Sequence, residues 1–374
     1  MASLAYSSAG VNTHIEALAS QIMYQASKRT WQNRSGNIGE IFVPFDDFSG
    51  IKIVRIGNLP AGSCMSFAGD GTGTKPTIVE LLDVRDTIGI DLVAMSADDA
   101  VQKGTEPGLI YNGLDLRSLG PDERHLPRIQ RIADGLVEGA YRANVAVING
   151  ELAQMGARIS GYGDFPFNWM SACVWFFNEK KILTGRKIRV GDVIILLREH
   201  GFRCNGFTLV YEILGKLGDD WHMHPFEDST LGMHVLTPST IYTRAIVAAH
   251  GGFATEGECD VHGVAHFTGG GIHEKMARLL RPTGLGAHLF DPFPVPKIMS
   301  RCQALGNLLD SDLYEAWNGG QGMGVVVPKA HADGFIACAQ RFSLEAKVGG
   351  EIVLQPGISI VSRGMEKPGK ILSF

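Results

Sequence analysis

The chain has 374 residues, of which 45% are hydrophobic, and it carries a formal net charge of −5 with a pI near 6.2. This length allows two ordinary domains or one large one, and the apolar share is sufficient for a full core. The acidic balance argues against a nucleic-acid or membrane-surface binder, because both partners select a basic face.

Targeting and redox features point to the cytoplasm. No apolar run reaches the roughly 18–20 residues that a membrane span requires. The first twenty residues, MASLAYSSAGVNTHIEALAS, lack a basic segment followed by a continuous apolar core, so we do not expect a secretory signal. The six cysteines stand singly, with no C-x-x-C pair, which is typical of reduced thiols in a cytosolic protein. We therefore predict a cytoplasmic protein.

Helical and strand-like segments mix along the first half of the chain. Ile15, Leu18, Ile22 and Ala26 follow one another at three- and four-residue steps, which predicts an amphipathic helix over 11–27. The elements expected after it are strands at 51–57, 108–116, 145–150 and 169–177, and helices at 86–103 and 122–143. Gly104 is the expected stop of the first of these two helices.

A charged segment at 178–192 is the best candidate for a domain boundary, because the pattern of elements restarts beyond it. The expected strands of the second half are 192–199, 263–268, 324–328 and 351–355, and the expected helices are 206–217, 239–251, 272–281 and 329–345. Strands and helices mix in both halves, so we predict an α/β (or α+β) protein of two domains, 1–178 and 179–374.

A glycine-rich loop, DGTGTK at 70–75, interrupts the apolar pattern of the first half. The lysine follows a threonine rather than a glycine, so the P-loop spacing is absent, and Asp70 lies inside the loop. Acids at strand ends with Lys75 nearby suit a magnesium-bridged triphosphate, because magnesium prefers oxygen ligands. The alternative is that Asp70 forms a turn and that Asp98 and Asp99 are solvated helix acids.

A second glycine cluster, HFTGGGIHEKMARLL, places three glycines directly before a predicted helix. Free N–H groups and the helix dipole attract anions such as phosphate there, although the same pattern also fits a loose turn. His262 and His266 lie in a strand-like run, where a step of four residues spans about 13 Å, so we do not expect a shared zinc ion.

Taken in order, these segments and four others resemble the aminoimidazole ribonucleotide synthetase family. The motifs are DGTGTK (70–75), DTIGIDLVAM (86–95) with the acid pair and GTEP that follow it, NGE (149–151), GDVIILL with NGFTLV (191–210), GVAHFTGGG (263–271) and NGGQGMG (318–324). One such motif would be weak evidence, whereas six in colinear order over nearly the whole chain identify the superfamily.

The resemblance implies a fold and an activity. The family has two α/β domains, and its N-terminal domains pair into a barrel across a homodimer. Its enzymes use ATP and Mg²⁺ to phosphorylate the formyl oxygen of formylglycinamidine ribonucleotide. A neighbouring nitrogen then closes the imidazole ring of aminoimidazole ribonucleotide and expels phosphate, a step of purine biosynthesis. The implied partners are this ribonucleotide and a second copy of the chain, with no nucleic acid or membrane.

The resemblance also implies which residues form the site. The nucleotide would contact Asp70, Gly71, Thr72, Gly73, Thr74 and Lys75 of the first loop, and Gly269, Gly270 and Gly271 of the second. Asp70, Asp99 and Glu151 would bind the metal, and the substrate side would include Arg203, Asn205, Gly206 and Thr268. Asp70, Lys75 and His266 would be the catalytic residues, although His266 fits a structural role equally well.

The chain departs from the family pattern mainly on the substrate side. Arg203 stands where the family has a histidine, Asn112 and Gln154 stand where it has acids, and Thr240 stands where it has an arginine. An arginine is thus gained at one substrate position and lost at another. Three interpretations stay open: the family's own cyclisation, a reaction of the same superfamily on another substrate, and a silent binding protein. The second class includes formylglycinamidine synthetase, selenophosphate synthetase and thiamine-phosphate kinase.

Overall fold

The computed structural model describes residues 12–44, 51–57 and 59–374, and these residues divide into two compact units. The first unit contains the described residues up to Ala97 together with Pro107–Phe176. The second contains Asp98–Glu106 and Phe177–Phe374. The end of one helix therefore belongs to the second unit, and the division into an N-terminal domain at 1–178 and a C-terminal domain at 179–374 stays a prediction.

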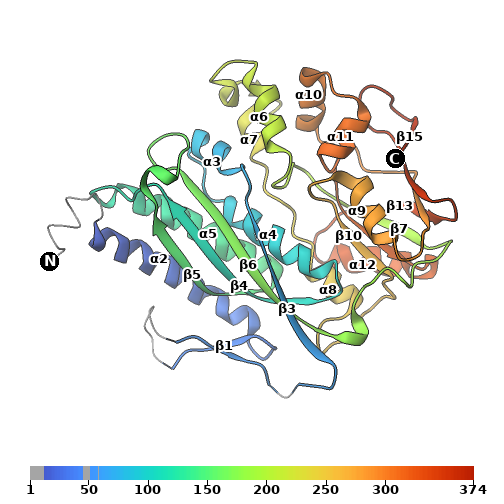
Figure 1. Ribbon diagram of the computed structural model, residues 1–374, viewed down its shortest axis with the longest axis horizontal. Helices are drawn as coiled ribbons and strands as arrows, with labels where there is room; N and C mark the ends of the chain where they lie inside the picture. Colours follow the sequence, from blue (N-terminus) through green and yellow to red (C-terminus); the bar gives the residue numbers. More distant parts are fainter. Residues whose placement is uncertain (1–11, 45–50, 58) are drawn as a thin grey trace. The chain divides into compact units, whose positions relative to one another are not determined.

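The first unit contains a four-stranded sheet with the order β3-β6-β4-β5 (Figure 1). Its strands are β3 (Ser63–Gly71), β4 (Glu106–Leu116), β5 (Ala146–Gln154) and β6 (Phe167–Asn178). Its helices are α2 (Thr13–Trp31), α3 (Pro76–Leu82), α4 (Ile88–Val101) and α5 (Leu126–Ala143). A separate two-stranded ribbon pairs β1 (Glu40–Phe42) with β2 (Ile53–Arg55).

The two faces of this sheet differ. Along β6, Trp169 and Ser171 are buried and the Ser171 hydroxyl bonds Ser96 of α4, so the helices cover this face. Met170, between them, points to the opposite face and is 53% exposed. A Cβ added to Gly113 of β4 would lie 3.8 Å from Met170 Cγ, which places β4 and β6 side chains on this open face together.

Helices α4 and α5 touch at the level of their backbones. A Cβ added to Gly89 would lie 2.1 Å from the backbone nitrogen of Leu136, so any larger residue would push the two helices apart. Gly135 meets the backbone oxygen of Asp86 at 2.4 Å in the same way. Glycine at this crossing is therefore a packing requirement of the layer behind the sheet.

The second unit contains a mixed seven-stranded sheet with the order β10-β12-β7-β13-β11-β14-β15. The strands are β7 (Val193–Arg198), β10 (Gly263–His266), β11 (Gly286–Leu289), β12 (Gln321–Val327), β13 (Ala346–Val353), β14 (Gly357–Val361) and β15 (Ile371–Ser373). Neighbouring strands run antiparallel except β11 and β14. A strand pair, β8 (Pro225–Phe226) with β9 (Ser229–Thr230), lies outside this sheet.

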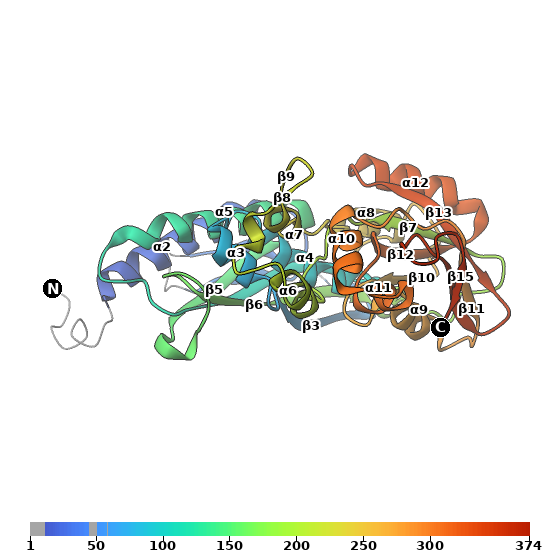
Figure 2. The same ribbon diagram turned by 90° about the horizontal axis from the view of Figure 1, so that it is seen from above.

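Helices cover both faces of this sheet (Figure 2). On one face, α8 (Thr243–His250) and α12 (Ala332–Arg341) pack on inward-facing residues of β7 and β12 to form an apolar core. On the other face, α9 (Gly271–Leu280) brings Met276 near Gly324 of β12. The remaining helices are α6 (Phe207–Gly215), α7 (Leu231–Val235), α10 (Lys297–Gly306) and α11 (Asp310–Ala316). Short 3₁₀ turns occupy 32–34, 123–125, 156–158, 179–181, 221–223 and 329–331.

The mixed α/β class expected from the sequence is confirmed, while several element bounds differ. The helix expected over 239–251 begins only at Thr243, because the backbone of 240–242 bonds side chains of other segments. The strand expected at 351–355 is β13, which starts at Ala346. Two helices and one strand between 286 and 316 were not predicted. Among the described residues, no helix is both long and apolar enough to cross a bilayer.

Candidate active site

The first glycine-rich loop joins the end of β3 to α3. Thr72 anchors it: its backbone N–H and its hydroxyl both donate to the carbonyl oxygen of Trp169, at 3.2 and 3.3 Å, and its side chain is buried. Asp70 is exposed, and its carboxylate accepts a hydrogen bond of 2.7 Å from the N–H of Gly71. The loop therefore holds a fixed backbone while it presents one carboxylate to solvent.

Lys75, at the end of this loop, points into the first unit. Its ammonium lies 2.8 Å from the carboxylate of Asp91 in α4, and both side chains are 0% exposed. A buried ion pair of this kind holds the loop to the helix behind it. The contact between Lys75 and a phosphate, implied by the family resemblance, would need this ammonium to leave the core and stays a prediction.

Glu151 lies on β5 and lines a cavity of about 240 Å³ in the first unit. The opposite wall comes from α2, with Glu16, Ser20 and Tyr24. The cavity lining contains two carboxylates and no lysine or arginine, so it favours cations and hydrogen-bond donors over anions. Glu151 is exposed, which leaves its oxygen atoms accessible to a metal ion.

Two of the departures from the family pattern face the interior of the first unit. The Asn112 carbonyl accepts a hydrogen bond of 3.0 Å from the indole N–H of Trp169. The Gln154 amide donates to Glu16 (2.8 Å), and its oxygen accepts from the N–H of Leu119 (2.9 Å). Amides suit both places because each side chain also donates a hydrogen bond, Asn112 to the carbonyl of Asn149 (3.4 Å) and Gln154 to Glu16, which an ionised carboxylate could not do.

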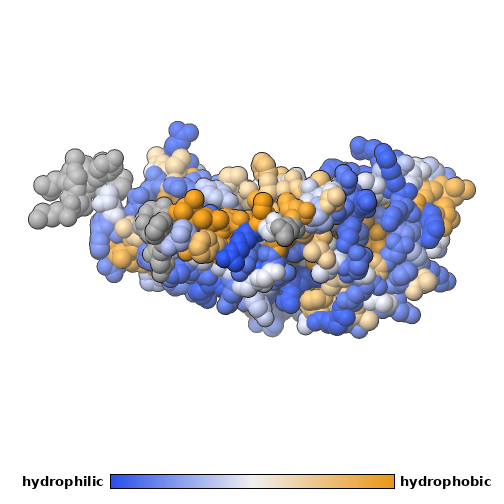
Figure 3. Space-filling model, turned by 90° about the horizontal axis from the view of Figure 1, so that it is seen from below, coloured by the Kyte–Doolittle hydropathy of each residue, from blue (hydrophilic) through white to orange (hydrophobic). Residues whose placement is uncertain are grey.

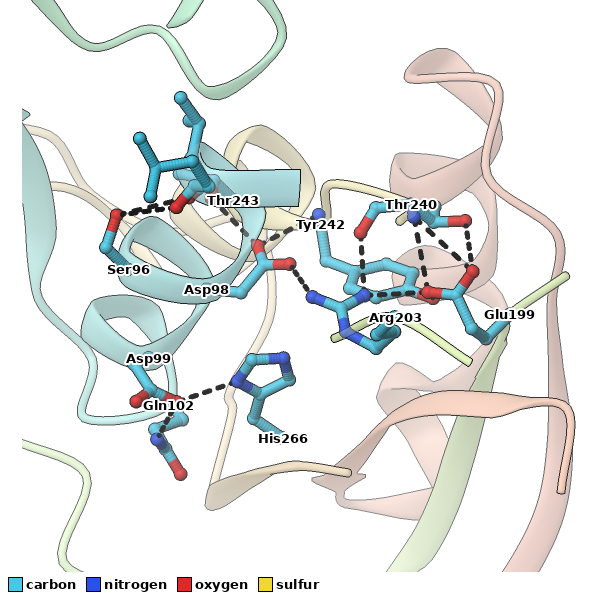
Figure 4. Close-up of polar contacts among 12 residues, drawn as sticks. Ser96, Asp98, Asp99, Gln102, Glu199, Arg203, Thr240, Tyr242, Thr243 and His266 are labelled. Atoms are coloured by element: carbon cyan, nitrogen blue, oxygen red, sulfur yellow. Dashed lines mark hydrogen bonds and ion pairs between the residues drawn. The ribbon is translucent and has the colours of Figure 1, made fainter. Parts of the chain in front are cut away.

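The acid pair at the end of α4 belongs to the second unit. Asp99 accepts two hydrogen bonds on Oδ1, from Nδ1 of His266 (2.8 Å) and from the amide of Gln102 (2.9 Å) (Figure 4). Oδ2 has no hydrogen-bond partner in the described chain, and the side chain is 36% exposed. Burial raises the pKa of this carboxyl, but the hydrogen bond and charge of His266 outweigh it and lower the pKa below its usual value.

His266 is held in one orientation with one ring nitrogen left over. Its side chain is fully buried at the end of β10, and the hydrogen bond to Asp99 fixes Nδ1 as the protonated nitrogen. Nε2 is buried and has no hydrogen-bond partner within the described residues. Because buried polar atoms are nearly always paired, this nitrogen marks a place for a ligand group or a water molecule.

The second glycine cluster has the backbone that its sequence demands. Gly270 and Gly271 have φ of +90° and +68°, and a Cβ on Gly271 would lie 1.9 Å from the carbonyl oxygen of Tyr314. A Cβ on Gly270 would lie 1.8 Å from a carboxylate oxygen of Glu274, which folds back over the start of α9. This carboxylate occupies space next to the helix N-terminus, so phosphate binding there would require Glu274 to move.

The other residues predicted on the substrate side surround this cluster. The Asn205 side-chain oxygen lies 3.5 Å from the Cβ position of Gly269, so these two predicted residues are neighbours. Thr268 supplies the carbonyl that receives the N–H of Gly271 (3.1 Å). Gly206, with φ of +70°, starts α6, and its carbonyl oxygen accepts the indole N–H of Trp317 (3.3 Å).

Arg203 requires a correction, because the structure gives its side chain protein partners rather than access to substrate. The side chain is 0% exposed, with Nη1 bonded to Glu199 (2.7 Å) and Nη2 to Asp98 (2.8 Å). Burial disfavours the charged guanidinium, but these two carboxylates outweigh it and raise the pKa of Arg203 above its usual value. Arg203 is thus an anion binder, as the sequence suggested, but its anions belong to the protein.

Asp98 is likewise not a solvated helix acid, the alternative that the sequence left open. It is fully buried and accepts hydrogen bonds from the backbone N–H of Tyr242 (3.0 Å) and the hydroxyl of Thr243 (2.9 Å), besides Arg203. In this way Asp98 caps the start of α8 with a side chain from another segment. The neighbouring acid Asp99 keeps one oxygen accessible, so the two adjacent aspartates have different roles.

The predicted metal ligands are divided between the units, with Asp70 and Glu151 in the first and Asp99 in the second. Over residues 12–44, 51–57 and 59–374, no three His, Cys, Asp or Glu side chains converge on a possible metal position. Each of the three acids is at least partly exposed and supplies the oxygen ligands that magnesium prefers. The residues fit the ion individually, and their shared use stays a prediction.

Comparison with known proteins relates this geometry to a family. Residues 51–167 match the N-terminal domain of AIR synthase-related proteins, and residues 189–362 match the C-terminal domain. The phosphoribosylformylglycinamidine cyclo-ligase of Thermococcus kodakarensis is 31% identical over 365 residues, which cover 97% of this chain and 99% of that protein. The chain belongs to the AIR synthase-related family. The cyclo-ligase of Acetivibrio thermocellus is also 31% identical, over 93% of this chain and 96% of its own length.

Solved structures of low sequence identity share the fold of this AIR synthase-related chain. The hydrogenase maturation protein HypE, crystallised with ATP, has a TM-score of 0.56 at 15% identity and covers 86% of this chain and 87% of its own. Thiamine-monophosphate kinase from Stenotrophomonas maltophilia has a TM-score of 0.56 at 14% identity, over 91% of this chain and 95% of its own. T. maritima PurL, crystallised with FGAR, has a TM-score of 0.53 at 15% identity and covers 96% of this chain and 52% of its own.

Reasoning from the sequence missed the partners that hold the predicted residues. Asp91 and Glu199 carry the ion pairs of Lys75 and Arg203, and neither residue was singled out. Asp91 lies in an otherwise apolar stretch at the start of α4, IGIDLVAM, where an acid is unusual enough to predict a buried cation partner. Glu199 follows directly after the buried strand β7 and gives no comparable signal.

Proposed function

We propose that this AIR synthase-related protein catalyses the ATP-dependent cyclisation of formylglycinamidine ribonucleotide to aminoimidazole ribonucleotide. ATP phosphorylates the formyl oxygen and releases ADP. The neighbouring nitrogen attacks the same carbon, and the phosphate leaves with the former formyl oxygen. Such chemistry depends on positioning and charge neutralisation more than on a protein nucleophile.

The observation that carries this proposal is the extent of the similarity to cyclo-ligases. Identity of 31% continues over 97% of this chain and 99% of the relative, so the similarity extends over both units. The structures that share only the fold, at 14–15% identity, include proteins with other named activities and support no choice among them. The similarity to relatives named cyclo-ligases therefore supports the proposed reaction over the others.

The roles proposed for individual residues follow from their exposure and partners. Asp70, Glu151 and Oδ2 of Asp99 are the oxygen atoms offered to Mg²⁺, whose charge would neutralise the phosphates. The buried Nε2 of His266 is the hydrogen-bonding group offered to the substrate. Asn205, beside Gly269, is the amide offered to the ribonucleotide. The cytoplasmic location expected from the sequence stays a prediction.

The open face of the β3-β6-β4-β5 sheet supports the proposed homodimer. Met65 and Phe67 of β3 are 62% and 70% exposed, Met170 of the adjacent strand β6 is 53% exposed, and Tyr111 of the next strand, β4, is 45% exposed. Figure 3 shows hydrophobic residues gathered on one face of the molecule. Exposed apolar side chains in a group mark an interaction surface, and a second copy of the same sheet would cover them and close the barrel expected for the family.

The dimer is tested by changing Phe67→Lys and measuring molar mass by light scattering. We expect the wild-type chain to have twice the mass of a monomer, and the variant to dissociate with an unchanged circular dichroism spectrum. Lys52→Ala is a control away from this sheet. A wild-type monomer, or a variant that stays dimeric, would contradict the barrel.

The reaction is tested with purified protein, formylglycinamidine ribonucleotide and MgATP. We expect one ADP for each imidazole ribotide formed, and no product when EDTA removes magnesium. ATP hydrolysis that this ribonucleotide does not stimulate, but another acceptor does, would replace the proposal with a related superfamily reaction. Absence of nucleotide binding in calorimetry would indicate a silent binding protein.

A further inference from the structure

Two positions at which the chain departs from the family pattern meet in one buried cage of the second unit (Figure 4). Nη1 of Arg203 donates to the carbonyl oxygen of Thr240 at 2.7 Å, as well as to Glu199. Thr240 itself donates to Glu199 from its backbone N–H and from its hydroxyl, both at 3.2 Å. The position where this chain has gained an arginine (203) and the position where it lacks one (240) therefore both contact the carboxylate of Glu199.

The cage holds one cation, whose two terminal nitrogens are both bonded, while its buried Nε has no hydrogen-bond partner among the described residues. Glu199 and Asp98 are 1% and 0% exposed and face the guanidinium from two segments, while the ring of Tyr242 lies 5.3 Å from it. The Tyr242 hydroxyl donates to Glu199 and to the carbonyl of Arg198. Two buried carboxylates this close need a cation, because uncompensated charge inside a protein is strongly unfavourable.

The backbone conformation at position 203 indicates that the contacts of the cage, rather than the backbone, favour arginine there. Its φ is +57°, in the left-handed region that side chains other than glycine and asparagine seldom adopt. The hydrogen bonds of the guanidinium offset the cost of this conformation. A histidine at the same position would meet the same backbone cost, but its ring could not bridge Glu199 and Asp98 in the way that a planar guanidinium does.

From these contacts we infer that positions 203 and 240 form one coupled unit, in which a single guanidinium can be supplied from either side of the cage. Arg203 is then a positioning residue. Through Asp98 it fixes the last turn of α4, whose next residue is the proposed metal ligand Asp99. The two departures are one compensated exchange, so they do not indicate a changed substrate.

The experiment compares Arg203→His, Thr240→Arg and the double variant with the wild-type chain. Arg203→His leaves two carboxylates without their cation, and Thr240→Arg brings a second guanidinium against the first. We expect each single change to lower cyclisation turnover at least about tenfold and to lower the thermal midpoint. The double variant is expected to regain turnover to within about threefold of the wild type, a coupling well above additivity.

A matched control separates this exchange from a general effect of charge. Arg198 lies five residues earlier and pairs with the exposed Glu345, outside the cage. Combining Arg198→His with Thr240→Arg should give no recovery beyond Thr240→Arg alone. Recovery in this control, or a double variant whose loss equals the product of the two single losses, would overturn the inference.

The KM values distinguish positioning from substrate contact. A residue that acts through Asp98 changes kcat, so the KM for the ribonucleotide should shift less than about threefold in Arg203→His. A larger rise in this KM with kcat unchanged would assign Arg203 to the substrate and overturn the inference. Should Arg203→His fail to fold, recovery of a folded double variant supports the exchange, and an insoluble double variant contradicts it.

The turnover readout rests on the proposed cyclisation, whereas the thermal readout does not. A wild-type chain that does not cyclise the ribonucleotide, but whose variants show the expected coupling in thermal midpoint, removes the proposed function and keeps the exchange. A wild-type chain that cyclises, with additive effects in both readouts, keeps the function and removes the exchange.

Discussion

Lys75 in the first unit and Arg203 in the second are both buried cations of the predicted site, but they are held differently. The ammonium of Lys75 pairs with the carboxylate of Asp91, a residue of the same unit, at 2.8 Å. Arg203 in the second unit is bonded to two carboxylates and a carbonyl, supplied by three separate segments. The lysine follows a glycine-rich loop with an exposed acid, whereas the arginine lies inside a closed network.

This difference separates two roles that a buried cation can have, binding an incoming ligand and holding the fold together. An ion pair beside a loop holds local backbone, and its cation can exchange its partner when another anion arrives. A guanidinium bridging several segments ties together elements that are distant in the sequence, and its removal affects all of them. We therefore expect the first unit to respond to ligands at its buried cation and the second unit to depend on its cation for folding.

The largest expected effect is that of Arg203→Met, which breaks the second network. Two carboxylates lose their cation in a fully buried place, so we expect a loss of about 5 kcal/mol in unfolding free energy. Urea denaturation followed by circular dichroism measures it, with Arg198→Met, whose side chain is 35% exposed and pairs with Glu345, as the control. A loss below about 1 kcal/mol would mean that the cage does not need its cation.

A somewhat smaller loss, about 3 kcal/mol, is expected for Lys75→Met, which leaves one carboxylate uncompensated. Replacing both partners, as Lys75→Met with Asp91→Leu, should restore most of this stability, because an apolar pair of similar size can substitute for a buried ion pair. Turnover should stay absent in the double variant if Lys75 also contacts ATP. Recovered turnover would limit the lysine to a structural role.

A third test uses Asp310, a carboxylate of the second unit that accepts hydrogen bonds from uncharged donors. Asp310 accepts hydrogen bonds from the amide of Gln303 (2.6 Å), the hydroxyl of Ser362 and the backbone N–H groups of residues 366 and 367. Burial raises its pKa, but these donors outweigh burial and lower the pKa below 3.8. The ionised form is thus the one that the fold stabilises.

Since its folded-state pKa is depressed, Asp310 contributes stability above the unfolded value near 3.8 and loses it as the pH falls through the lower folded value. Asp310→Asn should cost about 2 kcal/mol at pH 7, because hydrogen bonds to a charged group are lost. Urea denaturation at pH 7, 4 and 3 should show the gap to the wild type narrowing below pH 3.8. A gap independent of pH would exclude the ionised carboxylate as its cause.

The smallest effect on stability is expected for Asp70→Asn, where the first unit exposes its acid. The side chain is at the surface and accepts the adjacent N–H, so unfolding free energy should change by less than about 0.5 kcal/mol. Turnover should nevertheless fall at least about a hundredfold, if this carboxylate binds magnesium. Glu179→Gln is a control at an exposed acid outside the site. Unchanged turnover would remove Asp70 from the metal site.

Much of the fold could be predicted because periodicity and glycine placement are local properties. The helix at 86–103 and the strands at 108–116 and 169–177 agree with α4, β4 and β6 to within a few residues. No helix was predicted between 282 and 320, where α11 has only seven residues, about two turns and too few to show an apolar period. The start of α8 at Thr243 was missed for another reason, because Asp98, distant in sequence, binds the residues that precede it.

The candidate site was predictable only in part. The sequence singled out Asp99 and His266 independently, and the structure brings them within 2.8 Å. It also singled out Asn205 and Gly269, which are neighbours. For Lys75 and Arg203 the residue type indicated an anion partner, but the sequence did not show which anion. The partner of a buried charge is the compensating group nearest in space, which the order of residues does not reveal.

By itself the sequence determined the family, the mixed α/β class and the set of acids and glycines from which a site can be built, because these depend on residue type and order. Only the tertiary structure decided which charges are buried and paired. Asp98 and Asp99 are adjacent in the chain, yet one closes a buried cage and the other keeps an oxygen exposed. The physical reason is that compensation of charge acts over a few ångströms in space, whatever the distance along the chain.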